Sequence, residues 1–171
     1  MSLSRLCAAL ACALPLPFLA SCLRAQGANG QPVAGIRCDA QEGQRIHIHQ
    51  HLLILDHGTP VEIPSNVGRP FMRPCLYWLH THTPDGIIHI EAPVDRSFTL
   101  ADFFAVWGQP LSRTEAATAR AAQGDSLHVW VDGKPYTGDP RAIVLQAHTD
   151  IVIEAGPPFP PPPRFTNWGR L

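Results

Sequence analysis

Histidine is the residue type whose placement in this chain points most directly to chemistry. Seven of the nine histidines lie between residues 47 and 89. A neutral imidazole is a good ligand for zinc, copper, nickel and iron, whereas imidazoles held together without a metal repel one another once they are protonated. The clustering therefore predicts a metal site. An exposed histidine face, or core histidines bonded to the backbone, is the alternative.

Three of these histidines occupy alternate positions of one predicted strand, residues 45–55. They are His47, His49 and His51. Successive side chains of a strand point to opposite faces of the sheet, so alternate residues share a face. The three imidazoles are therefore expected on one face of the sheet, with Ile46 and Ile48 on the other.

A predicted hairpin supplies three further histidines. Its strands, residues 76–82 and 87–91, are joined at Thr83-Pro84-Asp85-Gly86, where proline suits the second position of a turn and glycine the fourth. A tight turn there sets His80 opposite His89, and His82 shares the face of His80. Up to six imidazoles then face a common space. We predict these six as metal ligands: His47, His49, His51, His80, His82 and His89.

Glu91 is the acidic residue expected beside these histidines, because it shares a strand face with His89. It is a candidate metal ligand, hydrogen-bond acceptor or general base, and thus the one candidate catalytic residue. An ordinary surface acid is the alternative. Because imidazole outnumbers carboxylate, we expect copper or zinc ahead of iron. The sequence has no nucleophile elbow, phosphate loop or dinucleotide fingerprint, and it leaves open whether the protein is an enzyme.

The remaining three histidines are expected to do something else. His57 falls in a predicted turn over residues 56–59 and is expected at the surface. His128 and His148 lie far along the chain, without histidines at alternate positions beside them. We therefore expect His128 and His148 to be structural.

The N-terminal segment has the pattern of an export signal. A single basic residue precedes an apolar run over residues 6–20, which is too short to span a bilayer comfortably. The run ends in Leu19-Ala20-Ser21-Cys22, a bacterial lipobox pattern, with ordinary signal cleavage as the alternative. We predict a signal peptide over residues 1–21, a lipid anchor on Cys22 and a tether over residues 22–34. The protein would be exported and lipid-anchored at the cell envelope, on its periplasmic or extracellular face.

Cysteine usage agrees with export. Of the five cysteines, two fall in the predicted signal peptide and one is Cys22, so Cys38 and Cys75 remain. In an oxidising compartment two remaining cysteines are expected to pair. The alternative is that one of them gives a thiolate to the metal, since Cys75 lies five residues before His80.

Composition sets the fold class that must position these residues. The 171 residues are 45% hydrophobic and 16% charged, with a formal net charge of -1. This balance excludes a disordered chain and a nucleic-acid partner bound by charge. The 18 prolines and 13 glycines favour turns and strands over helices. We predict a mainly β protein of the α+β class, a small β-sandwich or barrel, with a β-rich metal-binding domain over residues 35–156.

Several segments refine this expectation. Thr99 and Asp102 form a capping box for a helix that ends at Gly108. Residues 114–123 are alanine-rich and predict a second helix or a loose excursion. Residues 142–145 and 151–154 predict two strands. The Pro-rich tail, residues 157–171, either packs back through Phe165 and Trp168 or stays free.

Two pairs of segments resemble each other. Residues 79–92 resemble residues 145–155, and residues 53–60 resemble residues 129–135. This similarity suggests two related β-lobes joined by the helix. Because short turn motifs recur by chance, an accidental likeness of hairpins is the alternative.

Three motifs resemble a family of exported or surface-anchored microbial proteins known only as uncharacterised. They are C-L-Y-W-L-H-T-H over residues 75–82, G-I-I-H-I-E over residues 86–91, and the aromatic run over residues 98–108. The resemblance begins at about Cys38. It implies that residues 38–163 form one unit, and it brings no assigned activity.

Two functions fit these patterns. The first is an extracytoplasmic, lipid-anchored protein that binds copper or zinc for metal handling or metal-assisted chemistry. The second is a non-catalytic envelope module that binds a partner protein, in which the histidines are structural or pH-responsive.

Overall fold

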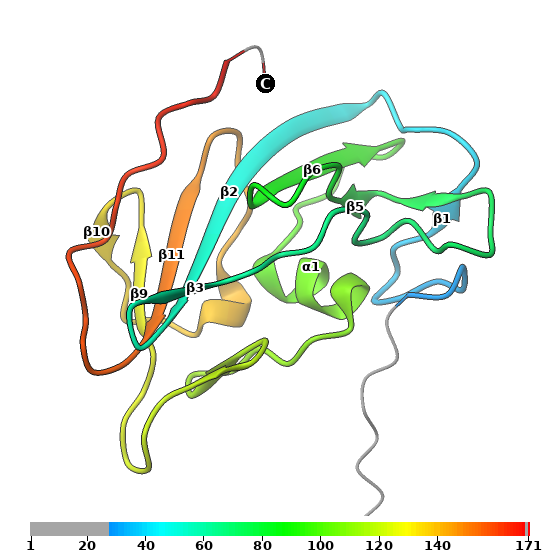
Figure 1. Ribbon diagram of the computed structural model, residues 1–171. Helices are drawn as coiled ribbons and strands as arrows, with labels where there is room; N and C mark the ends of the chain where they lie inside the picture. The colour runs from blue at the N-terminus through cyan, green and yellow to red at the C-terminus, as the bar shows by residue number, and fades with distance from the viewer. Residues whose placement is uncertain (1–27, 170) are drawn as a thin grey trace, which may run out of the picture.

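The computed structural model describes residues 28–169 and residue 171, in which a central β-sheet packs against a single α-helix (Figure 1). The helices are α1 (Leu100–Trp107) and the short 3-10 helix η1 (Pro140–Ala142). The strands are β1 (Cys38–Asp39), β2 (Ile46–Asp56), β3 (Thr59–Val61), β4 (Leu76–Tyr77), β5 (Leu79–His80), β6 (Ile87–Ala92), β7 (Glu115–Ala116), β8 (Ala119–Arg120), β9 (His128–Val131), β10 (Lys134–Pro135) and β11 (Asp150–Ala155). The predicted mainly β, α+β class is confirmed.

The central sheet has seven strands in the order β10-β9-β11-β2-β6-β5, with β3 also paired to β2. β2 is eleven residues long and has different neighbours along its length. Its N-terminal half pairs antiparallel with β6, from Ile46 opposite Ala92 to His51 opposite Ile87. Its C-terminal half pairs in parallel with β11. The segments that resemble each other therefore lie in one sheet, in which β2 and β6 of the first half are joined to β9 and β11 of the second half through the β2–β11 pair.

The two faces of this sheet differ because β2 and β6 alternate apolar and polar side chains. Ile54, Ile90 and Ile153 belong to the hydrophobic core together with Phe103 and Phe104 of α1. The histidines of β2 occupy the intervening positions, so they point to the opposite face. The sheet thus presents an apolar face to α1 and its histidines to the other side.

Helix α1 begins and ends at the residues that the sequence indicates. The Asp102 N–H donates to the Thr99 hydroxyl, and the Thr99 N–H donates to the Asp102 carboxylate. These two bonds satisfy N–H groups that have no partner inside the helix. Gly108 ends the helix at φ 74°, a left-handed conformation that glycine adopts without strain.

Residues 115–120 form the β7–β8 hairpin, so the second helix, one of the two alternatives predicted for residues 114–123, is wrong. Ala116 and Ala119 are fully buried in this hairpin, and Ala117 has a φ of 52°. Alanine favours a helix only weakly, by a few tenths of a kcal/mol per residue over most others. Burial of small side chains against the sheet outweighs that preference here.

Two predicted strands also differ from the structure. Residues 142–145 begin within η1, and the segment makes one isolated bridge, between Val144 and Thr99. The predicted strand over residues 76–82 divides at Trp78, because β4 pairs with β1 whereas β5 pairs with β6.

The disulfide between Cys38 and Cys75 explains where that strand divides. The two Cα atoms are 5.3 Å apart, and Cys38 lies in β1 while Cys75 directly precedes β4. The disulfide prediction is confirmed, and the alternative of a cysteine thiolate as metal ligand is wrong. The bond holds β4 on β1 and leaves β5 free to join the central sheet.

The Pro-rich tail packs on the histidine-bearing face of the sheet, as one of the two expectations had it. Phe159, Phe165 and Trp168 stack on His128, His51 and His148, with ring centroids 3.8, 4.1 and 4.7 Å apart. The Asp150 carboxylate accepts from the Phe165 N–H at 3.0 Å. In Figure 1 the tail runs past β10 toward the far end of β2.

The structure does not test the predicted export features. Residues 1–21, Cys22 and the first part of the tether lie outside the described residues. Within residues 28–169, the helices are too short or too polar to cross a bilayer.

Candidate metal centre

Strand register brings three imidazoles into one row across β2, β6 and β5. His49 pairs with His89, and His89 pairs with His80. Paired residues of antiparallel strands carry their side chains on the same face. The ring centroids of His49 and His89 are 4.5 Å apart, and those of His80 and His89 are 5.5 Å apart. The predicted alignment of His80 with His89 is confirmed.

Two overlapping groups of side chains offer ligand atoms that all lie within 4.8 Å of one another. The β2 group consists of His47, His49, His89 and Glu91. The β5 group consists of His80, His82, His89 and Glu91. Histidine and glutamate side chains are therefore positioned to hold a metal ion, and five of the six predicted histidines are among them.

Glu91 lies between the two groups. Its side chain is only 5% exposed, and its Oε1 atom is 3.2 Å from His47 Nε2 and 3.7 Å from His89 Nδ1. Its Oε2 atom is 3.8 Å from His80 Nε2. Glu91 thus does not behave as an ordinary surface acid: its carboxylate contacts histidines of three strands.

Burial keeps the inner imidazoles neutral. Desolvation lowers the pKa of His80 to about 4 and that of His89 to about 3, with smaller effects from neighbouring histidines. Desolvation, and then His47, lowers the pKa of His49 as well. Because a metal binds the unprotonated ring nitrogen, these three side chains need not lose a proton to bind an ion at neutral pH.

Hydrogen bonding selects the nitrogen of His80 that can bind a metal. The Tyr77 carbonyl accepts a hydrogen bond from His80 Nδ1 at 2.9 Å. The proton therefore resides on Nδ1, and the lone pair resides on Nε2. Nε2 is 3.2 Å from His82 Nε2. Two ligand atoms about 2.0–2.1 Å from a tetrahedral ion are about 3.3 Å apart, so this pair has the spacing of two ligands.

Two charged residues that strand periodicity does not single out also lie at the centre. Arg69 Nη1 donates to His82 Nδ1 at 3.2 Å. Burial is the main cause of the raised Glu91 pKa, and the charge of nearby Glu42 is the next largest effect that raises it. Both residues lie in loops, far from Glu91 in the sequence. The alternation of side chains along a strand cannot predict that residues in distant loops lie beside it.

Two buried polar atoms of the centre have no hydrogen-bond partner among the described residues. They are His89 Nδ1 and Glu91 Oε2. A buried polar atom without a partner costs about 1–3 kcal/mol, and native structures contain few of them. A cation bound between these side chains would supply the missing interaction.

His51, the sixth predicted ligand, belongs to neither group. Its Nδ1 donates to Asp150 Oδ1 at 2.9 Å, and its ring stacks on Phe165. The parallel register of β11 sets Asp150 beside His51. The alternation of β2 correctly gives His51 the same face as His49, but it cannot show that β11 and the tail engage the ring there.

The three histidines that were not predicted as ligands also lie outside both groups. His57 is in the turn between β2 and β3, where its Nδ1 contacts Asp56 at 2.8 Å. His128 and His148 stack on aromatic residues of the tail.

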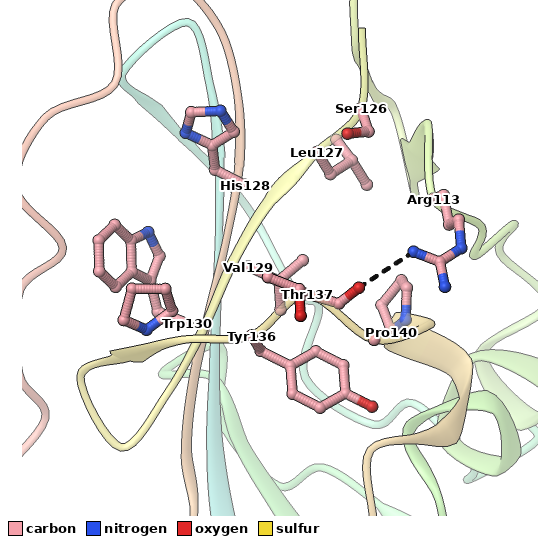
Figure 2. Close-up of a pocket in the computed structure, with 11 residues that line it drawn as sticks. Arg113, Ser126, Leu127, His128, Val129, Trp130, Tyr136, Thr137 and Pro140 are labelled. Atoms are coloured by element: carbon pink, nitrogen blue, oxygen red, sulfur yellow. Dashed lines mark hydrogen bonds between the residues drawn. The ribbon is translucent and has the colours of Figure 1, made fainter.

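A separate pocket of about 480 Å³ lies beside β9 and β10 (Figure 2). Apolar and aromatic side chains such as Val129 and Tyr136 line it, and Arg113 donates from Nη1 to the Thr137 carbonyl at its edge. None of the residues in the β2 group or the β5 group lines this pocket. The pocket and the histidine centre are therefore distinct features of the molecule.

The chain was compared with protein-family models, with curated proteins and with solved structures, and none of the three comparisons found a match.

Proposed function

We propose that this is an exported, lipid-anchored envelope protein that binds a transition metal, copper or zinc, through its histidine centre. The observation that carries the proposal is the convergence of five histidines and Glu91 within two overlapping groups of ligand atoms. The export and the anchor rest on the lipobox that ends at Cys22. Membrane attachment would then occur through the lipid on Cys22.

The donor set supports copper or zinc. Imidazole nitrogen suits both ions, and a predominantly imidazole set with one carboxylate is less typical of magnesium or calcium, which prefer oxygen ligands. Strands hold such ligands more rigidly than loops do. The proposal covers both metal handling and metal-assisted chemistry. Metal-assisted chemistry requires an open coordination position on the metal where water or substrate can bind.

Elemental analysis tests the metal proposal directly. The purified chain, stripped with a chelator and then reconstituted with Zn²⁺ or Cu²⁺, is expected to retain at least one equivalent after desalting. Its melting temperature should rise, because an ion that binds only the folded state stabilises it. Retention of less than half an equivalent of either metal would end the proposal.

The anchor is tested separately by cell fractionation. Cys22→Ser removes the thiol that would carry lipid, and the chain is expected to move from the membrane fraction to the soluble fraction. Cys12→Ser, within the predicted signal peptide, is the matched control and should leave the distribution unchanged. Equal membrane association of both variants would contradict lipid attachment at Cys22.

One observation favours the alternative, a non-catalytic module that binds an envelope protein. Phe71 and Met72 are adjacent in the loop before β4, and they are 98% and 83% exposed. Exposed apolar pairs of this kind occur at protein contacts. If Phe71→Ser and Met72→Ser abolish co-purification of an envelope protein while metal content is negligible, this second function replaces the first.

A further inference from the structure

The β2 group and the β5 group share His89 and Glu91 but differ in their other members. One ion could occupy either group, or two ions could occupy both. We propose that the centre binds a pair of transition-metal ions bridged by the Glu91 carboxylate, an inference that rests on the proposed metal-binding function. Three features support a pair of ions: the orientation of the two Glu91 oxygens, the number of available ligands, and the negative charge near the histidines.

The two oxygens of Glu91 face different groups. Oε1 lies 3.2 Å from His47 Nε2, on the β2 side. Oε2 lies 3.8 Å from His80 Nε2, on the β5 side. A carboxylate that gives one oxygen to each of two ions bridges them, and paired catalytic ions in proteins are about 3.5–4 Å apart. The orientation of Glu91 is that of a bridge rather than of a ligand to one ion.

Oε2 is the atom that most needs a cation. It is buried and has no hydrogen-bond partner among the described residues, whereas Oε1 has His47 beside it. A single ion in the β2 group would leave Oε2 without a partner. Occupation of the β5 group as well would satisfy it.

The two groups contain enough ligands for two ions. With Glu91 shared, His47 and His49 remain for one ion, and His80 and His82 remain for the other. A neutral imidazole has a single lone-pair nitrogen, so His89 completes one of the two sets. The other ion then has three protein ligands and an open position for water, the arrangement that catalytic zinc sites use.

Charge at the centre also favours a pair. Glu42 lies near enough to Glu91 for its charge to act on that carboxylate, so a second acidic group lies near the histidines. Two neighbouring carboxylates repel each other, and a cation near both relieves that repulsion. A second carboxylate also reduces the repulsion between two bound cations. His47, with 59% of its side chain exposed, keeps the centre accessible to solvent.

Stoichiometry and magnetic coupling test the proposal together. The full chain, purified in detergent and stripped of metal, is titrated with Zn²⁺ by calorimetry and with Cu²⁺ by electron paramagnetic resonance. We expect two equivalents of either ion. The two Cu²⁺ ions should show the signature of a spin-coupled pair, either a half-field signal or a loss of signal intensity relative to two isolated ions.

Variants at accessible positions separate the two ions. His47→Ala and His82→Ala each remove a ligand of one group only, and neither side chain is fully buried. Each should reduce binding from two equivalents to one and convert the Cu²⁺ spectrum to that of an isolated ion. His57→Asn is the matched control, since His57 lies in neither group and its φ of 51° suits asparagine. It should retain two coupled ions.

Each outcome decides something different. Two equivalents with coupling, reduced to one by either histidine variant, supports the bridged pair. A single equivalent in the unaltered chain, or two ions without coupling, overturns the bridge while leaving the proposed metal binding intact. No binding of Zn²⁺ or Cu²⁺ overturns both. Melting temperatures of the metal-free variants within a few degrees of the unaltered chain show that lost binding is not lost folding.

Discussion

At the scale of single residues, the centre is a set of neutral imidazoles around one buried carboxylate, with Arg69 at its edge. Arg69 donates to His82 Nδ1, which leaves the proton of His82 on Nε2, the nitrogen beside His80. For His82 to bind a metal through Nε2, its proton must move to Nδ1 and the hydrogen bond from Arg69 must break. The guanidinium also adds a positive charge beside a cation site, so it opposes metal binding in two ways.

We therefore expect Arg69→Gln to increase metal affinity. Two unit charges about 4 Å apart interact by about 1 kcal/mol even in bulk water, so we expect at least about a fivefold lower Kd for Zn²⁺. Arg73→Gln is the control, because it removes the same charge from the same loop without touching His82. Calorimetry at fixed ionic strength measures both, and an unchanged or weaker Kd for Arg69→Gln would refute this role.

The neutral histidines also predict how the metal-free protein responds to pH. His80 and His89 have folded-state pKa values of about 4 and about 3, below the usual 6.5. As pH falls below 6.5, the unfolded chain takes up protons that the folded chain does not, so stability is lost down to about pH 4. The raised pKa of Glu91 acts in the opposite direction, because the folded protein gains that proton more readily.

Urea unfolding in the presence of a chelator measures this dependence. Each of the two histidines should remove on the order of 3 kcal/mol of unfolding free energy between pH 7 and pH 4. His89→Gln should flatten the curve, because an amide does not titrate, whereas His57→Asn should leave the slope unchanged. A curve of equal slope in all three proteins would mean that burial of His89 does not control the acid response.

At the scale of elements, the centre depends on the tight turn that sets β5 beside β6. Gly86 in this turn has a φ of 78°, and a Cβ atom there would collide with the Leu52 carbonyl oxygen. A side chain at this position is therefore opposed both by the left-handed backbone and by the backbone of β2. The approach of the turn to β2 is what aligns His89 with both neighbouring strands.

Gly86→Ala should consequently lower stability and weaken metal binding together. Gly124→Ala is the matched control, because Gly124 has a φ of 91° and a Cβ atom added there would meet only open space. The control should lose about 1 kcal/mol from backbone strain alone, and Gly86→Ala should lose distinctly more. Thermal unfolding and Zn²⁺ affinity are the measurements. Equal losses in the two variants would show that the contact with β2 is unimportant.

The sequence predicts these elements well where local chemistry decides them. β2, the turn before β6 and α1 follow from alternation, a Pro-Asp-Gly turn and a capping box, and all three are seen. The β7–β8 hairpin and the division at Trp78 depend on tertiary burial and on the Cys38–Cys75 bond, which local propensity does not contain. For the same reason strand periodicity cannot separate His51, which the structure places beside Asp150 and Phe165, from the five histidines of the centre. It also gives no sign of Glu42 or Arg69.

At the scale of the whole molecule, the Pro-rich tail, residues 157–171, packs over the same sheet face that carries the metal centre. Its aromatic residues stack on His51, His128 and His148, none of which belongs to the β2 group or the β5 group. Arg164 donates to the Asp132 carbonyl and lies 3.4 Å from the Asp150 carboxylate. The histidines on this face thus divide into those that can hold metal and those that hold the tail.

This division predicts that the tail supports stability but not metal binding. Phe165→Ala removes the stack on His51, and an aromatic contact of this kind is worth about 0.5–1.5 kcal/mol beyond the apolar area buried. For a chain of this size we expect the melting temperature to fall by about 2–8 °C, with the Zn²⁺ stoichiometry unchanged. Phe71→Ala, at a side chain that is 98% exposed, is the control and should leave both unchanged. If Phe165→Ala instead lowered the number of bound ions, His51 would have to be counted with the ligands, as the strand alternation alone indicates.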